Sequence, residues 1–119
     1  MRYADGFVLP VPVKNLQACL RMARKAGRIW REHGALEYRE CVADDLNPKM
    51  SGPFKSGLGL KRGETVVFSW IVYKSRAHRD RVNAKAMKDP RIAKMADPKA
   101  MPFDCTRMAC GGFKVLVDL

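Results

Sequence analysis

The sequence predicts an α+β domain in which four strands and two helices follow one another in the order βαββαβ. Three observations support this fold class: one long and strongly apolar strand, two segments with helical periodicity, and three further segments of strand-forming residues. The chain of 119 residues is 47% hydrophobic, which suffices for one packed core. We therefore expect a single domain spanning residues 1–119.

The first strand is expected at residues 5–13, in the run DGFVLPVPV. Pro10 and Pro12 cannot donate a ladder hydrogen bond, so this strand should lie at an edge of the sheet or leave the ladder early. A helix should follow almost at once, because Asn15 is a plausible N-cap.

This first helix is expected to run to about His33, with Gly34 as the residue that ends it. One side carries the residues expected to be buried: Leu16, Leu20, Ala23, Gly27 and Trp30. The other side carries the cations expected to face water: Arg21, Arg24, Lys25, Arg28 and Arg31.

A second strand is expected at residues 35–43, where alternation of apolar and polar residues indicates a position near the edge of the sheet. Residues 44–63 then form a long connection containing several glycines and prolines. A connection of this length without clear periodicity is typical of a binding or assembly loop.

The third strand, Glu64–Tyr73, is the segment around which the chain is organised. Its two faces are both mainly apolar, with Val66, Phe68, Trp70 and Val72 on one of them. The helices can cover only one face, so we expect a second subunit to cover the other. The sequence therefore predicts a homodimer.

The second helix should begin at the N-cap Ser75 and end at Pro90. Its inward face is expected to carry His78, Val82 and Ala86, with Met87 flanking. Residues 94–106 are expected to be irregular. The last strand is expected at residues 107–117, where Gly111 and Gly112 mark a bulge or a close backbone approach.

This order of elements is the split βαβ or ferredoxin-like arrangement, an antiparallel sheet with two helices on one face. The first and third strands are central in that topology. The strongly apolar character of Glu64–Tyr73 agrees with a central position.

The net charge of +11 is the unusual feature of the composition. Residues 1–34 and residues 75–95 each carry seven Lys or Arg against two acids, so the excess lies on the two predicted helices. No apolar run approaches the ~20 residues of a membrane span. Asp5 and the prolines interrupt the only N-terminal apolar run, which argues against a signal peptide, so we expect a cytoplasmic protein.

The thiols and histidines do not form a metal-binding pattern. The four cysteines, at positions 19, 41, 105 and 110, have no CxxC spacing. We expect all four to be reduced and to serve mostly as small core residues. His33 and His78 are the only histidines and lie far apart in the sequence, so we expect no metal and no cofactor.

Short runs distributed along nearly the whole chain resemble the YbaA-like family of small bacterial proteins, a domain of unknown function in the dimeric α/β-barrel superfamily. These runs are DGFV at Asp5, HGAL at His33, ETVVFSWI at Glu64, DPR at Asp89, MPFD at Met101, and RM followed by GGF from Arg107 to Phe113. The resemblance implies a homodimer in which two four-stranded sheets pack face to face into a barrel. It implies no particular activity, because the superfamily includes cofactor-independent monooxygenases, small isomerases and ligand-binding modules.

One candidate ligand site is a pocket between the sheet and the helices, lined by Trp70, Tyr38, His78 and the MPFD run. A half-buried histidine can act as a general base or bind a ligand carbonyl. The alternative is that His78 is a histidine at the edge of the core, bonded to nearby backbone or a carboxylate. Trp70 and Tyr38 are then core or dimer-interface residues.

Asp104 and Arg107 form a second candidate, because Arg107 could hold an anionic ligand by a bidentate contact. Alternatively, Asp104 caps a turn and Arg107 ties a loop to the sheet. Glu40, Asp44 and Asp45 could hold a divalent cation, but they equally fit a solvated strand end.

Nucleic-acid binding is the third candidate. An RNA-recognition motif shares the βαββαβ order and stacks bases on aromatic residues of its sheet, and Phe68 and Trp70 fit this superficially. Its RNP1 pattern fails, because Arg62 and Gly63 are followed by Glu64 rather than by an aromatic residue. Weak contact between RNA and the arginines of the first helix, Arg21, Arg24 and Arg28, stays open.

The sequence thus favours a homodimeric small-molecule binding protein or cofactor-independent enzyme, with candidate ligand contacts from His78, Trp70, Tyr38, Asp104 and Arg107. A basic RNA-associated protein acting through its helices is the alternative, and an interaction protein without a ligand is a third possibility. Whether the chain catalyses a reaction is left open by the sequence.

Overall fold

The computed structural model describes residues 1–46 and 57–119. Its main elements follow the chain as β1 (Tyr3–Pro12), α1 (Leu16–Glu32), β2 (Glu37–Val42), β3 (Glu64–Tyr73), α3 (Arg76–Lys88), α4 (Pro90–Met95) and β4 (Ala109–Lys114). This confirms the predicted βαββαβ order, to which α4 adds a short helix. Part of the predicted 44–63 connection lies outside the described residues.

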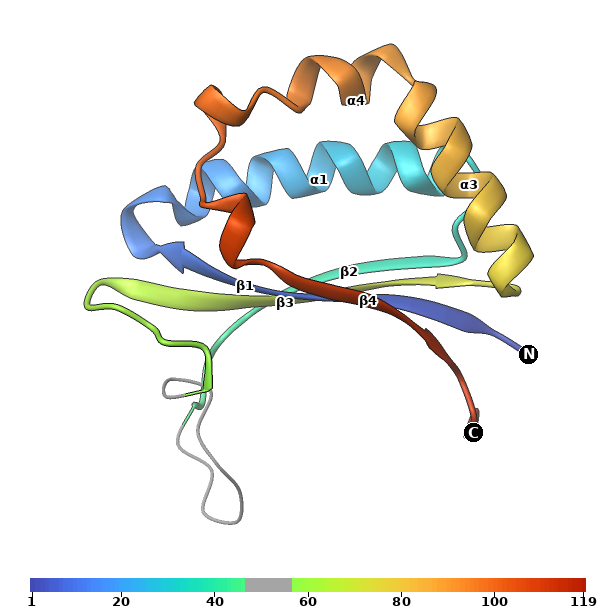
Figure 1. The fold of residues 1–119 in the computed structure, drawn as a ribbon, viewed down its shortest axis with the longest axis horizontal. Helices are drawn as coiled ribbons and strands as arrows, with labels where there is room; N and C mark the ends of the chain where they lie inside the picture. Colours follow the sequence, from blue (N-terminus) through green and yellow to red (C-terminus); the bar gives the residue numbers. More distant parts are fainter. Residues whose placement is uncertain (47–56) are drawn as a thin grey trace.

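The four strands form one antiparallel sheet in the order β2-β3-β1-β4. The first and third strands are central, as predicted. Helices α1, α3 and α4 lie on one side of this sheet (Figure 1). The ferredoxin-like α+β fold is therefore confirmed.

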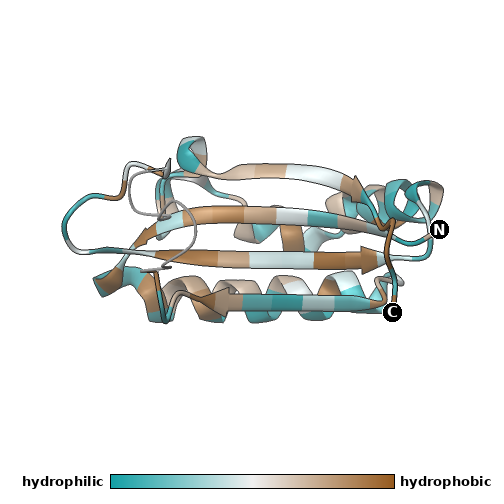
Figure 2. Ribbon diagram, turned by 90° about the horizontal axis from the view of Figure 1, so that it is seen from below, coloured by the Kyte–Doolittle hydropathy of each residue, from teal (hydrophilic) through white to brown (hydrophobic). Residues whose placement is uncertain are grey.

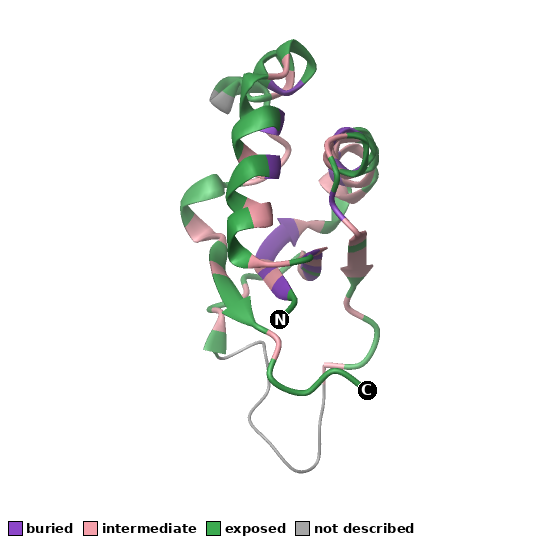
Figure 3. Ribbon diagram, turned by 90° about the vertical axis from the view of Figure 1, so that its right-hand side faces the viewer, coloured by how far each residue is buried: buried purple, intermediate pink, exposed green. Residues whose placement is uncertain are grey.

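The side chains of β3 alternate between a covered and an open face of the sheet. Val67, Ile71 and Tyr73 are buried against the helices, whereas Phe68, on the other face, is 45% exposed. Figure 3 shows the buried residues concentrated in the centre of the sheet and on the facing sides of the helices. Figure 2, drawn from the side away from the helices, shows apolar segments along the central strands.

The prolines of β1 lie where this central strand has a neighbour on one side only. β4 pairs with β1 from Tyr3 to Val8, whereas β3 continues to pair with it as far as Pro12. Pro10 and Pro12 therefore lie beyond the reach of β4, where a missing N–H costs no hydrogen bond on that side. Both predicted explanations are therefore wrong for the strand as a whole: β1 is central and stays paired with β3 through both prolines, and it is β4 that ends before them.

Helix α1 has the predicted length, but its buried stripe differs from the predicted one. The buried residues are Cys19, Gly27 and Ile29, whereas the predicted Leu16, Leu20, Ala23 and Trp30 are only partly buried. The stripe differs because α1 packs on two neighbours: Cys19 joins the sheet residues Leu9, Val11 and Val67, whereas Ile29 lies beside α4. Asn15 precedes the helix without a side-chain cap, because its Nδ2 donates to the Pro102 carbonyl at 3.0 Å.

Helix α3 begins as predicted, with the Ser75 hydroxyl accepting from the His78 N–H at 3.1 Å. Val82 and Ala86 are buried, whereas Met87 is 63% exposed and faces away from the core. The helix ends just before Pro90, close to the predicted position, but a further helix, α4, follows at once and reaches into the segment 94–106 that was expected to be irregular. Asp89 accepts from the Arg91 N–H at 2.9 Å, so it caps a new helix with proline in its first turn.

The last strand is shorter than the predicted 107–117, and its register with β1 contains no bulge. Gly112 provides the predicted close approach, because a Cβ atom there would lie 2.2 Å from the Tyr3 hydroxyl oxygen.

The expectation that the cysteines are mostly core residues is wrong. All four thiols are free, but only Cys19 is buried, and Cys105 and Cys110 are exposed. These two lie in a surface turn and on the edge strand β4.

Within residues 1–46 and 57–119, no helix combines the length and the apolar character that a membrane crossing requires.

Candidate functional site

The five predicted ligand residues do not meet in one pocket. Trp70 lies on the open face, where its ring contacts Phe68 at a centroid distance of 5.6 Å and its Nε1 donates to Glu37 at 3.0 Å. Tyr38 and His78 lie on the covered side. Because successive residues of a strand point to opposite faces, Trp70 cannot share a pocket with them.

His78 closes the first turn of α3. Its Nδ1 accepts from the Lys74 N–H at 3.0 Å, and its ring lies edge-on to Tyr73 at 6.0 Å between centroids. Partial burial and the neighbouring Lys74 lower the pKa of His78, which favours the neutral ring that this bond requires. These contacts match the structural alternative for His78, a histidine bonded to backbone at the edge of the core.

Asp104 and Arg107 lie at the other end of β3 from His78. Asp104 accepts from the Thr106 N–H at 3.0 Å and caps a short turn, Cys105–Arg107. Arg107 forms a two-pronged contact with Glu64 and also donates to the Gly59 carbonyl at 3.2 Å. Both residues therefore make the contacts of the structural alternative, a capped turn and a loop tied to the sheet.

The acidic group at Glu40, Asp44 and Asp45 does not form a cation site. In the parts of the chain that the structure describes, no three His, Cys, Asp or Glu side chains gather as metal ligands would. Glu40 instead lies beneath the helices, where burial raises its pKa and bonds from Tyr38 and Ser69 oppose this rise.

A polar cluster that the sequence did not reveal lies between the sheet and the helices. Asp5, on the covered face of β1, is only 7% exposed. Burial raises its pKa, although the Arg79 guanidinium, with Nε at 3.8 Å, opposes the rise. The Asn83 Oδ1 accepts from both the Tyr73 hydroxyl and the Trp30 indole, each at 3.0 Å. This cluster joins β1, β3, α1 and α3, and its residues line neither of the clefts found beside α1.

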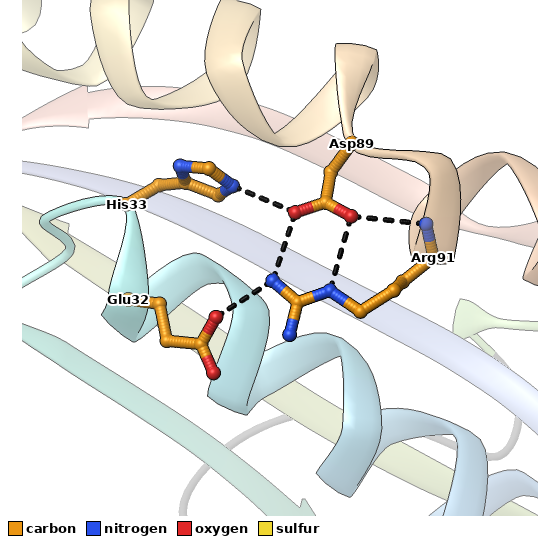
Figure 4. A network of polar contacts seen from close by, with 4 residues as sticks. All are labelled: Glu32, His33, Asp89 and Arg91. Carbon is orange, nitrogen blue, oxygen red and sulfur yellow. Dashed lines mark hydrogen bonds and ion pairs between the residues drawn. The ribbon is translucent and has the colours of Figure 1, made fainter.

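A second polar network ties the C-terminal end of α1 to the start of α4 (Figure 4). Asp89 accepts from the guanidinium of Arg91 at 3.1 and 2.9 Å and contacts His33 Nε2 at 2.9 Å. The bonds from Arg91 first, and then the one from His33, hold the pKa of Asp89 well below its usual range. Arg91 also binds Glu32 at 2.6 Å, so the charge of Glu32 is already paired.

A cleft of about 770 Å³ lies beside α1, between this helix and the edge strand β2. We call it the α1–β2 cleft. Its lining is strongly basic and consists of Arg24, Gly27, Arg28, Arg31, Glu32, Leu36, Glu37, Tyr38 and Arg39. Of the residues proposed from the sequence, Tyr38, Arg24 and Arg28 meet here, whereas Arg21 does not line the cleft.

Gly27 and Tyr38 shape the inner wall of this cleft. A Cβ atom at position 27 would lie 2.6 Å from the Tyr38 ring, so only glycine lets α1 pack this closely on the ring. Burial first, and then the neighbouring Glu40, raise the pKa of Tyr38, so its hydroxyl stays neutral. The helical spacing predicted that Arg24 and Arg28 share one side of α1, but the sequence did not indicate that β2 lies opposite them.

Comparison with known proteins places this chain. The model of a family described as proteins of unknown function, DUF1428, matches residues 2–105. The chain belongs to the DUF1428 family. Curated relatives include the uncharacterized protein YbaA of Escherichia coli K12 and that of Shigella flexneri, each 42% identical over 118 residues, or 99% of either chain. The predicted family resemblance is thereby confirmed.

Among solved structures, the chain resembles a dimeric ferredoxin-like protein from an uncultured marine organism, with a TM-score of 0.61 and 11% identity over 99% of this chain and 98% of that one. It also resembles the de novo designed protein Foldit4, with a TM-score of 0.50 and 10% identity over 97% and 99% of the two chains. At these identities the likeness concerns the fold alone, and it supports the ferredoxin-like assignment for this DUF1428 member.

Proposed function

We propose that this DUF1428 protein is a cytoplasmic homodimer that binds a small molecule in the α1–β2 cleft. The observation that carries the proposal is the cleft itself: about 770 Å³ in volume, shaped by Gly27 and Tyr38, and rimmed by arginines. Ligand sites of small molecules commonly occupy about 300–1,000 Å³. If the bound compound is converted, the same cleft is the active site of a cofactor-independent enzyme.

The open face of the sheet supports the homodimer. Phe68 and Phe113 are 45% and 61% exposed there, next to Trp70. Exposed aromatic groups of this size on one face are typical of a protein interface. The solved structure from the marine organism is described as dimeric, which agrees with face-to-face packing of two sheets.

The homodimer is tested by the mass in solution, measured by light scattering at low and at high salt. Because the buried surface is apolar, we expect twice the mass of the chain under both conditions. Phe68→Glu should yield a monomer, since it places a charge in the interface. Met87→Glu is the control, because Met87 is also a large apolar residue and is even more exposed, 63% against 45%, but lies on α3. A monomeric wild type would contradict the dimer, and equal effects of both variants would contradict an interface on the open face.

Ligand binding is tested by screening metabolites for a rise in the melting temperature, since a ligand that binds only the folded state stabilises it. The hit is then located by amide shifts in NMR spectra. We expect shifts at Gly27 and Leu36–Arg39, which line the cleft. Shifts confined to Glu64 and Arg107, at the other end of the sheet, would show that the compound binds outside the cleft.

RNA binding is the alternative function, favoured by the exposure of Arg21, Arg24 and Arg28 on α1. It predicts salt-sensitive binding that weakens strongly when all three are replaced by Gln. Binding that is insensitive to this triple replacement would exclude α1 as the RNA contact.

A further inference from the structure

The arginines of the α1–β2 cleft differ in whether their guanidinium groups already have hydrogen-bond or ion-pair partners. Arg31 donates to the backbone carbonyls of Ala35, at 2.9 Å, and Leu36. Arg39 donates to the Tyr38 carbonyl at 3.1 Å and lies 3.8 Å from Glu37. These two guanidinium groups therefore serve the backbone around β2.

Arg24 and Arg28 have no such role. Both are exposed, and neither forms a hydrogen bond or ion pair with any residue in the described segments 1–46 and 57–119. They lie four residues apart on one helix face, separated by about 6 Å along its axis. Like charges at this spacing repel one another, so an anion between them would relieve the repulsion.

The acids that line the cleft cannot supply this neutralisation. Glu32 is held by Arg91 at 2.6 Å, and Glu37 accepts from the Trp70 indole at 3.0 Å. Both carboxylates are therefore engaged by partners other than Arg24 and Arg28. They also belong to the C-terminal end of α1 and the start of β2, so they would repel any anionic group that extended beyond Arg28 towards Arg31.

The rest of the lining suits a compact apolar group. Leu36, Gly27 and the ring of Tyr38 offer carbon surface beside the two free guanidinium groups. A chain of phosphates would need contacts along the whole helix, including Arg21, and would meet the two glutamates. A small molecule places its charge at one end of the cleft and its apolar body at the other.

We infer that the ligand of the α1–β2 cleft is a small organic dianion, such as a phosphate monoester with an apolar or aromatic body, held by Arg24 and Arg28. This inference rests on the proposed small-molecule function and names its ligand class. Two guanidinium forks match the charge and the geometry of a phosphate group.

Phenyl phosphate is a suitable probe, and calorimetric titration of the full chain measures its binding. We expect Arg24→Gln and Arg28→Gln each to raise the dissociation constant about tenfold or more, because each removes a charge-assisted contact. Arg21→Gln is the matched control, since it makes the same change on the same helix outside the cleft. It should leave the constant within about twofold. Phenol, which lacks the dianion, should not bind detectably.

Three outcomes would overturn the inference: no binding of phenyl phosphate to the wild type, equal losses in the Arg21 and Arg24 variants, or tighter binding of a uridine oligonucleotide that all three variants weaken equally. Melting curves of the variants confirm that each is folded. If phenyl phosphate fails but an uncharged hit from the metabolite screen still shifts Leu36 and Tyr38, the ligand class is wrong and the small-molecule function stands. If no compound shifts these residues, both fail.

Discussion

The same strands form both faces of the sheet, but the two faces differ in how far their side chains are buried. On the covered face, Val67, Ile71 and Tyr73 are buried by helices of the same chain. On the open face, Phe68 and Phe113 are largely accessible. The described residues thus cover one face well and the other only in part, where Val66 is buried but Phe68 is not. Stability should therefore depend mainly on the covered face and assembly on the open one.

The largest expected effect is on the covered face. Tyr73→Ala should lower the free energy of unfolding by about 3–5 kcal/mol, because it empties a fully buried site. Tyr73→Phe keeps the ring and removes only the hydroxyl, which bonds to Asn83 and interacts with Asp5, so it should cost about 1 kcal/mol. Urea denaturation at low protein concentration measures both. A loss from Phe68→Ala as large as that from Tyr73→Ala would erase the difference between the faces.

A smaller effect is expected from adjacent glycines of β4 that face opposite sides. Gly112→Ala would place a methyl group 2.2 Å from the Tyr3 hydroxyl on the covered face and should cost about 1–3 kcal/mol. Gly111→Ala meets only ordinary contacts, 3.6 Å from the Phe113 ring, and should change stability by less than about 0.5 kcal/mol. Melting curves of the two variants decide this. Both curves are recorded at low protein concentration, where the chain is least associated, and a loss from Gly111→Ala as large as that from Gly112→Ala would contradict the difference between the two faces.

The smallest effect concerns the buried carboxyl group of the covered face. The raised pKa of Asp5 means that the folded state holds its proton more tightly than the unfolded state. The free energy of unfolding should therefore fall as the pH rises from the pKa of Asp5 in the unfolded state, about 3.9, through its higher pKa in the folded state. Asp5→Asn removes this dependence. The unfolding free energy of the variant should therefore rise relative to that of the wild type as the pH increases from 4 to 7. The gain is about 1.4 kcal/mol for each tenfold difference in proton affinity between the folded and unfolded states. Urea titrations across this range measure it, and a constant difference would show that Asp5 is ionised at no cost.

Local patterns predicted the fold well because they depend on periodicity and on cap residues. The bounds of Glu64–Tyr73 and the Ser75 cap needed no tertiary information. Pro90 was harder, because the same residue ends one helix and begins another. Its second role depended on the preceding Asp89 acting as a cap.

The candidate site was predictable only in part, because it depends on register. The alternation in β3 already placed Trp70 on the face away from Tyr73, which should have separated it from His78. The meeting of Asp5 with Arg79 and Asn83, and of Tyr38 with Gly27, required the strand pairing and the position of α1. The one available signal for the Asp5 cluster was a charged residue within an apolar strand.

The bonds that Arg31 and Arg39 make to the carbonyls of residues 35, 36 and 38 have a consequence for solubility. β2 ends the sheet on one side, and an unprotected edge strand is a template on which another chain can add a strand. Here Arg39 occupies the Tyr38 carbonyl within β2, and Arg31 occupies the Ala35 and Leu36 carbonyls just before it. The charge of these two guanidinium groups also repels an identical edge. Addition of another chain at this edge of the sheet is thereby opposed.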